Sequence, residues 1–189
     1  MRRRFDSAYP HQVNFFLALG LVILIPVAIA SVIGAPPVWV PKRAARIMIR
    51  EAGLKSGEVG YDLGAGIGRL VAIGRKEFDA DVRGVEYVPI LWWIGKLNLL
   101  IQKISPSFLE PGNFYKMDFK STNVFFCFLM PKTLARLKSK WEREAKPGMR
   151  VVTYAMEIPG WTPIRTVKEE KLGRIYVYEP IKKNHLNHG

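Results

Sequence analysis

The sequence predicts an α/β domain built on a doubly wound, mostly parallel sheet, with a long apolar segment before it. Three observations support this prediction. Patterns typical of strands and of helices alternate along residues 41–180. Residues 123–129 are a continuous apolar run, as in central strands that are buried on both faces. A glycine-rich turn at residues 64–68 joins the first strand candidate to the helix candidate after it.

The elements follow from the spacing of apolar residues. The first helix is expected to begin at Pro41 and to end at Gly53. Its buried face consists of four apolar residues at helical spacing: Ala45, Met48, Ile49 and Ala52. The strand candidates are residues 58–63, 81–86, 113–117, 123–129 and 149–154, with 165–167 and 174–178 as a closing pair. The remaining helix candidates are residues 67–78, 89–103 and 131–144. About six residues separate the third strand from the fourth, which is too short for a full crossover helix.

The apolar segment, residues 15–33, reads FFLALGLVILIPVAIASVI and carries no charge over 19 residues. At roughly 1.5 Å per residue, a helix of this length spans most of a ~30 Å hydrocarbon core. We therefore predict a single transmembrane helix at 15–33, between a basic flank at 1–14 and a linker at 34–40. Two alternatives remain open. The segment fits a cleaved signal peptide, with a small-x-small site at residues 28–30, or a buried or interfacial helix.

Composition narrows the choice of partners. The chain has 29 Lys and Arg residues against 16 Asp and Glu residues, a formal net charge of +13. Such an excess favours an anionic partner, which can be nucleic acid, an acidic protein or an anionic bilayer. The single cysteine, Cys127, excludes an intrachain disulfide. No histidine or cysteine cluster has the spacing of metal ligands, so we predict no metal site.

The glycine-rich turn is the motif that carries chemistry. Asp62 and the glycines after it follow a strand candidate and open a helix candidate, and Glu86 ends the next strand, 22 positions after Gly64. Glycines in such a turn let the backbone approach a ligand closely, and the helix N-terminus offers it N–H groups. The second carboxylate can accept hydrogen bonds from both hydroxyls of a ribose. The chain lacks the G-x-G-x-x-G pattern that is typical of nicotinamide cofactors.

The pattern Asp62-x-Gly64-x-Gly66-x-Gly68 resembles motif I of class I S-adenosylmethionine (SAM)-dependent methyltransferases. The resemblance implies a Rossmann-like sheet of about seven strands and SAM as the cofactor. It also implies the residues that bind SAM, which are Asp62, Gly64, Ala65, Gly66, Gly68 and Glu86, together with Asp118 beside the adenine. The alternative for Asp118 is a plain turn aspartate.

The stretch from Trp39 to Trp161 is similar to a subfamily of protein lysine methyltransferases. That subfamily includes small archaeal enzymes of broad lysine specificity and membrane-anchored mitochondrial enzymes. The similarity rests on Val40-Pro41 and on residues 62–69, 129–131, 146–152 and 157–161. It implies that domain 41–180, followed by a tail at 181–189, methylates lysines of a membrane or membrane-associated protein. Because SAM is cytosolic, we expect a single-pass membrane protein whose catalytic domain is cytoplasmic.

Two residues after the fifth strand are the catalytic candidates. Glu157 is expected to orient the incoming lysine ammonium or to accept its proton, and Tyr154 is expected to bound the acceptor channel together with Trp161. The alternative for Glu157 is an ordinary exposed glutamate.

The subfamily usually has an acid at the position of Ile67, and often a histidine just before the acidic segment after the fifth strand. Two further functions therefore stay open: a methyltransferase that acts on RNA, lipid or a small molecule, and a catalytically silent, membrane-tethered binding protein. The chain has no separate RNA-binding module and no Asn-Pro-Pro-Tyr-type motif, so nucleic acid is not the expected partner.

Overall fold

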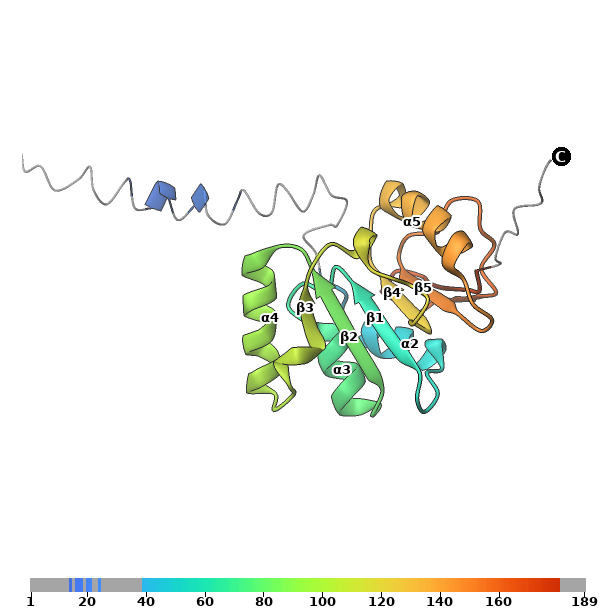
Figure 1. Cartoon of the computed structure of the whole chain (residues 1–189), viewed down its shortest axis with the longest axis horizontal. Coiled ribbons are helices and arrows are strands. Elements are labelled where there is room, and N and C mark those ends of the chain that lie inside the picture. The colour runs from blue at the N-terminus through green and yellow to red at the C-terminus, as the bar shows by residue number, and fades with distance from the viewer. Residues whose placement is uncertain (1–13, 15, 19, 22–23, 25–38, 181–189) are drawn as a thin grey trace, which may run out of the picture.

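The architecture is a single seven-stranded sheet with helices on both faces (Figure 1). It comes from a computed structural model that describes residues 14, 16–18, 20, 21, 24 and 39–180. The helices are α2 (Lys42–Ala52), α3 (Arg69–Glu77), α4 (Pro89–Ile101) and α5 (Pro131–Glu144). The strands are β1 (Val59–Leu63), β2 (Asp81–Glu86), β3 (Leu109–Pro111), β4 (Val124–Cys127), β5 (Arg150–Tyr154), β6 (Arg165–Val167) and β7 (Ile175–Tyr178).

The strands lie in the order β3-β2-β1-β4-β5-β7-β6. The five strands from β3 to β5 are parallel, whereas β7 runs antiparallel to both β5 and β6. The chain turns outward in both directions from β1, because β2 and β4 are its two neighbours. The predicted doubly wound, mostly parallel sheet of the Rossmann-like kind is therefore confirmed, including its antiparallel closing pair.

Alternation along the strands separates two hydrophobic cores. Phe126 and Val152 pack with the buried faces of α2 and α3, whereas Phe125 and Val151 point to the opposite face and pack with α5. All four residues of β4 are buried, which confirms that the apolar run is a central strand. The predicted inner face of α2 is also buried, and Gly53 ends that helix in the left-handed conformation.

The third strand differs from the prediction, which placed it at residues 113–117. The observed β3 is Leu109–Pro111, and residues 114–116 form a short 3-10 helix, η2 (Phe114–Lys116). Asn113 begins η2, because its side chain accepts a backbone N–H of that helix. As expected, the link between β3 and β4 contains no α-helix.

The N-terminal apolar segment lies almost entirely outside the described residues. Within the part of the chain that the structure describes, no helix is both long and apolar enough to cross a bilayer. The transmembrane helix at 15–33 therefore stays a prediction. The tail at 181–189 also lies outside the described residues.

Candidate active site

The candidate site forms at the carboxyl edge of the sheet, where parallel strands present their following loops together. The glycine loop (residues 64–68) follows β1, and Glu86 is the last residue of the neighbouring strand β2. The segments after β4 and β5 begin at the same edge, because Leu63 is in register with Cys127, and Cys127 with Thr153 (Figure 1). Loops that are separate in the sequence thus meet at one place.

The glycine loop has a backbone that side chains other than glycine rarely adopt. Gly64, Gly66 and Gly68 have φ angles of 79°, 55° and 71°. The N–H groups of Gly64 and Ala65 both donate to the carbonyl oxygen of Val85 in β2, at 2.9 and 3.0 Å. These hydrogen bonds fix the loop against the sheet, and Gly68 leads directly into α3. The predicted strand–turn–helix context of the motif is confirmed.

Glu86 joins this loop to α4. Its Oε2 accepts the N–H of Gly66 at 2.7 Å, and its Oε1 accepts the N–H of Val88, the residue before α4, at 2.7 Å. Burial raises the pKa of the Glu86 carboxyl, although these backbone N–H groups act in the opposite direction. A carboxylate oxygen has more than one lone pair, so both oxygens keep the capacity to accept further hydrogen bonds from a ligand.

Asp62 adds a second buried carboxyl. Burial, and next to it the charge of Glu86, raise the pKa of Asp62 to about 7. Neither carboxyl forms an ion pair with a basic side chain within residues 39–180. Two buried acids without a cationic partner favour a ligand that carries positive charge and hydroxyl donors.

Helix α4 supports the glycine loop from the side, which the sequence analysis did not anticipate. A Cβ at Gly95 would lie 3.0 Å from the carbonyl oxygen of Gly66 and 3.1 Å from the carbonyl carbon of Ile67. Asn98 Nδ2 donates to the carbonyl oxygen of Ile67 at 2.9 Å. The signal was present in the sequence, because a glycine and an asparagine three positions apart interrupt an otherwise apolar helix.

Trp39 is a second residue that the sequence analysis did not assign to the site. A Cβ at Gly66 would lie 3.5 Å from two atoms of the Trp39 indole, so the ring lies over the loop. The Arg69 guanidinium stands 5.7 Å from the centre of that ring. Arg69 Nη1 also donates to the carbonyl oxygen of Val40 at 2.9 Å. The first helix turn after the loop thus holds the Trp39 segment in place.

Tyr154 ends β5 at the same edge of the sheet. Its hydroxyl oxygen accepts the N–H of Gly173 at 3.1 Å, and its ring packs edge-on against Phe128 at 5.2 Å. The next residue, Ala155, has a φ of 63°, and the N–H of Met156 donates to the carbonyl oxygen of Tyr154 at 2.8 Å. This is a tight γ-turn with positive φ, a conformation rare for alanine. The strained turn lies where an acceptor would approach.

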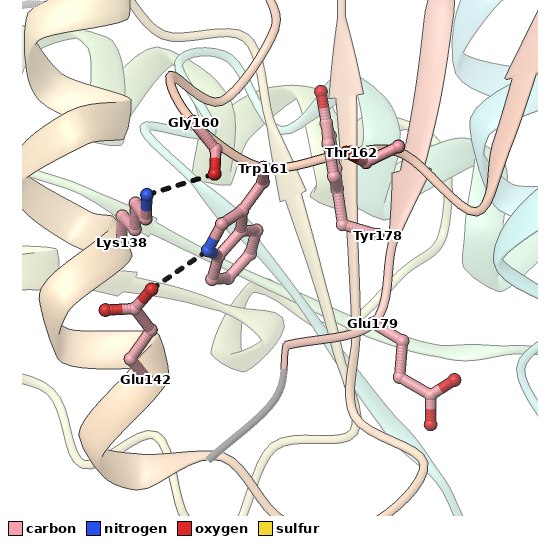
Figure 2. A pocket seen from close by; sticks show the side chains of 7 residues that line it. All are labelled: Lys138, Glu142, Gly160, Trp161, Thr162, Tyr178 and Glu179. Carbon is pink, nitrogen blue, oxygen red and sulfur yellow. Dashed lines mark hydrogen bonds between the residues drawn. The ribbon is translucent and has the colours of Figure 1, made fainter. Parts of the chain in front are cut away.

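Glu157 and Trp161 turn away from Tyr154. Whereas Tyr154 packs in the core under α2 and α3, Trp161 packs against the core under α5. Trp161 Nε1 donates to Glu142 of α5 at 3.1 Å and helps to line a pocket of about 430 Å³ (Figure 2). Glu157 is exposed, and its charge helps to raise the pKa of Tyr178, mainly a result of burial, on this α5 face. Tyr154 and Trp161 therefore do not form two walls of one channel.

Asp118 forms its own turn. Its side chain is exposed, and Oδ1 accepts the N–H of Lys120 at 3.0 Å. The adjacent Phe119 is buried against Phe125 and donates its N–H to Glu144, the last residue of α5. None of the contacts of the described residues joins Asp118 to Asp62 or Glu86, so the geometry supports the turn aspartate.

Comparison with known proteins identifies the family. The model of the ANTKMT methyltransferase domain matches residues 62–165. A protein-lysine N-methyltransferase of Saccharolobus islandicus is 32% identical over 137 residues, which cover 71% of this chain and 85% of that protein. The chain belongs to the ANTKMT methyltransferase family.

Two further relatives extend the comparison. This ANTKMT-family chain is 28% identical over 120 residues to a human lysine N-methyltransferase that is named for a component of ATP synthase, with 62% of the chain covered but only 50% of the human protein. The crystal structure of an RNA methyltransferase from Salinibacter ruber in complex with S-adenosyl-L-homocysteine superimposes with a TM-score of 0.71 at 26% identity. That superposition covers 78% of this chain and 97% of the bacterial one.

The chain is a SAM-dependent methyltransferase, and its own residues fit that cofactor. The three glycines leave the loop backbone accessible, and the two carboxyls without ion-pair partners suit a cation and a ribose. Within residues 39–180, no group of His, Cys, Asp and Glu could hold a metal ion. The chemistry of the site is therefore that of the loop, Asp62 and Glu86.

The raised pKa of Asp62 predicts that SAM affinity depends on pH. Below about pH 7 the Asp62 carboxyl is protonated in the free protein, so a cationic ligand loses one attractive charge. We expect the Kd of the full chain for SAM to rise by up to about tenfold per pH unit below pH 7. Calorimetry at several pH values measures this, with Asp62→Asn as the control whose weak binding does not change over the same range. A wild-type Kd that is constant across pH 7 would contradict the prediction.

The same carboxyl predicts a gain in stability when its charge is removed. Because folding raises the pKa of Asp62, its stability contribution is fully present below the unfolded pKa and is lost as the pH rises through about 7. We expect Asp62→Asn to raise the Tm of the ligand-free chain by several degrees at about pH 8. At about pH 5 the difference is expected to be small, because native Asp62 is then protonated. Thermal unfolding at both pH values decides, and an equal or lower Tm at the higher pH would contradict it.

Gly95→Ala tests the role of α4 as support for the loop. The added methyl would lie 2.4 Å from Leu109 Cδ2 and close to the loop backbone, so α4 has to move outward. We expect a loss of about 1–3 kcal/mol in unfolding free energy and a several-fold weaker binding of SAM. Gly20→Ala is the matched control, because a Cβ there would have no heavy atom within 4 Å. Unchanged SAM affinity in Gly95→Ala would show that the loop does not depend on α4.

Proposed function

We propose that this chain is a membrane-anchored SAM-dependent methyltransferase that methylates lysine side chains of a membrane or membrane-associated protein. The observation that carries the proposal is the pair of buried carboxyls, Asp62 and Glu86, beside the glycine loop in a chain of the ANTKMT family. The lysine substrate is supported by the similarity to the Saccharolobus islandicus and human lysine N-methyltransferases.

The chemistry places few demands on the protein. Bound SAM supplies an electrophilic methyl group on a positively charged sulfur. Asp62, Glu86 and the loop fix the position of the donor, and alignment of two reactants alone can contribute several kcal/mol, roughly 7–11 at most. The lysine amine has to lose a proton before its lone pair can attack, and then the methyl passes from sulfur to nitrogen.

The acceptor side is proposed to lie at the γ-turn after β5. The hydroxyl of Tyr154 already accepts one N–H, from Gly173, and still carries a hydrogen that it can donate. Tyr154 is therefore a positioning group, and water is the acceptor of the lysine proton. Exposed Glu157 attracts the ammonium towards this end of the sheet by its charge.

The membrane anchor is proposed on sequence alone. Residues 15–33 are long and apolar enough to span a bilayer, and residues 34–38 link them to Trp39 at the glycine loop. We place the catalytic domain in the cytoplasm, because SAM is available there. An anchor of this kind would raise the local concentration of lysines that lie near the membrane.

A second candidate function is methylation of RNA. It is favoured by the Salinibacter ruber RNA methyltransferase, which this chain covers almost completely, and by the net charge of +13. The chemistry of the SAM site is the same for both acceptors. The two functions therefore differ only in what approaches the γ-turn.

Transfer of labelled methyl groups separates the candidates. We expect the full chain, incubated with methyl-labelled SAM and membrane extract, to label protein, and acid hydrolysis to release the label as methylated lysine. Glu86→Ala is the negative control, because it removes the acceptor for both Gly66 and Val88. Label in nucleosides of extracted RNA, with none in lysine, would contradict the proposal and establish the second function.

A further inference from the structure

The outer face of α4 is unusually apolar for an exposed helix. Six large apolar side chains point away from the domain: Ile90, Trp93, Ile94, Leu97, Leu100 and Ile101, each between 41% and 72% exposed. They recur every three or four residues and so form one continuous stripe. Together they expose on the order of 500 Å² of apolar surface, at the upper end of what a soluble monomer shows. We call this set the outer face of α4.

This stripe is not an unfinished core contact. The side of α4 that packs on the domain carries Gly95, Asn98 and Leu99, which contact the glycine loop or the core. The helix lies beside the edge strand β3, at one end of the domain, and the outer face points away from the sheet (Figure 1). The helix is therefore amphipathic in the inverse sense, with its small and polar residues inside.

The charges around the outer face have one sign. Residues 88–108 contain no aspartate or glutamate, and their only charged residues are Lys96 and Lys103. The Lys96 ammonium lies 4.4 Å from the centre of the Trp92 ring, so its charge stays close to the helix. Apolar side chains with an exposed tryptophan and flanking lysines are the composition of helices that lie in the interface of an anionic bilayer.

The chain also brings this face close to its own apolar segment. Trp39 lies over Gly66, and Gly66 is in turn next to Gly95 of α4. Residues 34–38 separate Trp39 from the apolar segment, and five residues can span at most about 18 Å. A bilayer that holds residues 15–33 is therefore within reach of α4 without any change in the domain.

We propose that the outer face of α4 rests on the surface of an anionic bilayer, with its apolar side chains inserted among the lipid headgroups. This inference rests on the anchored form of the proposed function and adds an orientation to it. Because α4 also supports the glycine loop, such docking holds the SAM site beside the membrane surface. A tether alone would leave the domain free to turn in any direction.

A fluorescent probe on the full chain tests this orientation. The chain is reconstituted into vesicles of phosphatidylcholine with a minority of phosphatidylglycerol, and an environment-sensitive maleimide probe is attached to Leu97→Cys. Wild-type protein provides the labelling blank, because its single cysteine, Cys127, is buried. Ile164→Cys is the matched control, since Ile164 is 64% exposed and precedes β6 at the other edge of the sheet. A probe at Ala28→Cys reports separately on the apolar segment.

We expect the Leu97 probe to be shifted to the blue, to be several-fold brighter, and to be quenched by headgroup-labelled nitroxide lipids. The Ile164 probe should behave as in water, and Lys103→Glu should weaken the quenching at Leu97 in anionic vesicles. A water-like Leu97 probe beside a quenched Ala28 probe would overturn the docking proposal and leave the anchor intact. A blue-shifted Leu97 probe that lipid nitroxides do not quench would also overturn it, in favour of cover by protein. Methyl transfer to lysine in the same samples reports the proposed function independently.

Discussion

The buried carboxylate of Glu86 is the contact on which the site depends. Its two oxygens accept the N–H of Gly66 in the glycine loop and the N–H of Val88 before α4, so one side chain sets the distance between both elements. With Asp62 it forms a pair of acids that no basic side chain of residues 39–180 neutralises. Burial and mutual repulsion make the ionised pair costly until a cationic ligand arrives. The free protein thus holds an electrostatic cost that ligand binding relieves.

Much of the fold could be predicted because the strongest patterns were also the longest. Strand 81–86, helix 131–144 and strand 165–167 have the predicted bounds, and the apolar run at 123–129 contains β4. The exception, β3, has three residues and begins directly after a 3-10 helix, which leaves too short a stretch for an alternating pattern to be recognised. Its pairing with β2 decides its position, and that is a tertiary contact.

The site could be predicted where it is local in the chain, and not where it depends on approach between distant elements. The motif from Asp62 to Gly68 and the acid at Glu86 are separated by one helix, so their meeting follows from the order of strands. Trp39 reaches the loop from an earlier segment through Arg69, a contact that no spacing indicates. Trp161 follows Tyr154 closely in the sequence, yet the γ-turn directs the chain to the α5 face and separates them.

Helix α4 shows why its sequence is so apolar although little of it is buried. Its inner face has to approach the backbone of the glycine loop, which only a small residue such as Gly95 permits, and it has to satisfy the loop carbonyl that Asn98 reaches. Those two demands remove the large apolar residues from the side where helices usually carry them. A soluble enzyme would then be expected to have polar residues on the outside, whereas this chain has isoleucine, leucine and tryptophan there. Folding does not require those residues, so the outer face of α4 reflects a surface that the protein meets after it has folded.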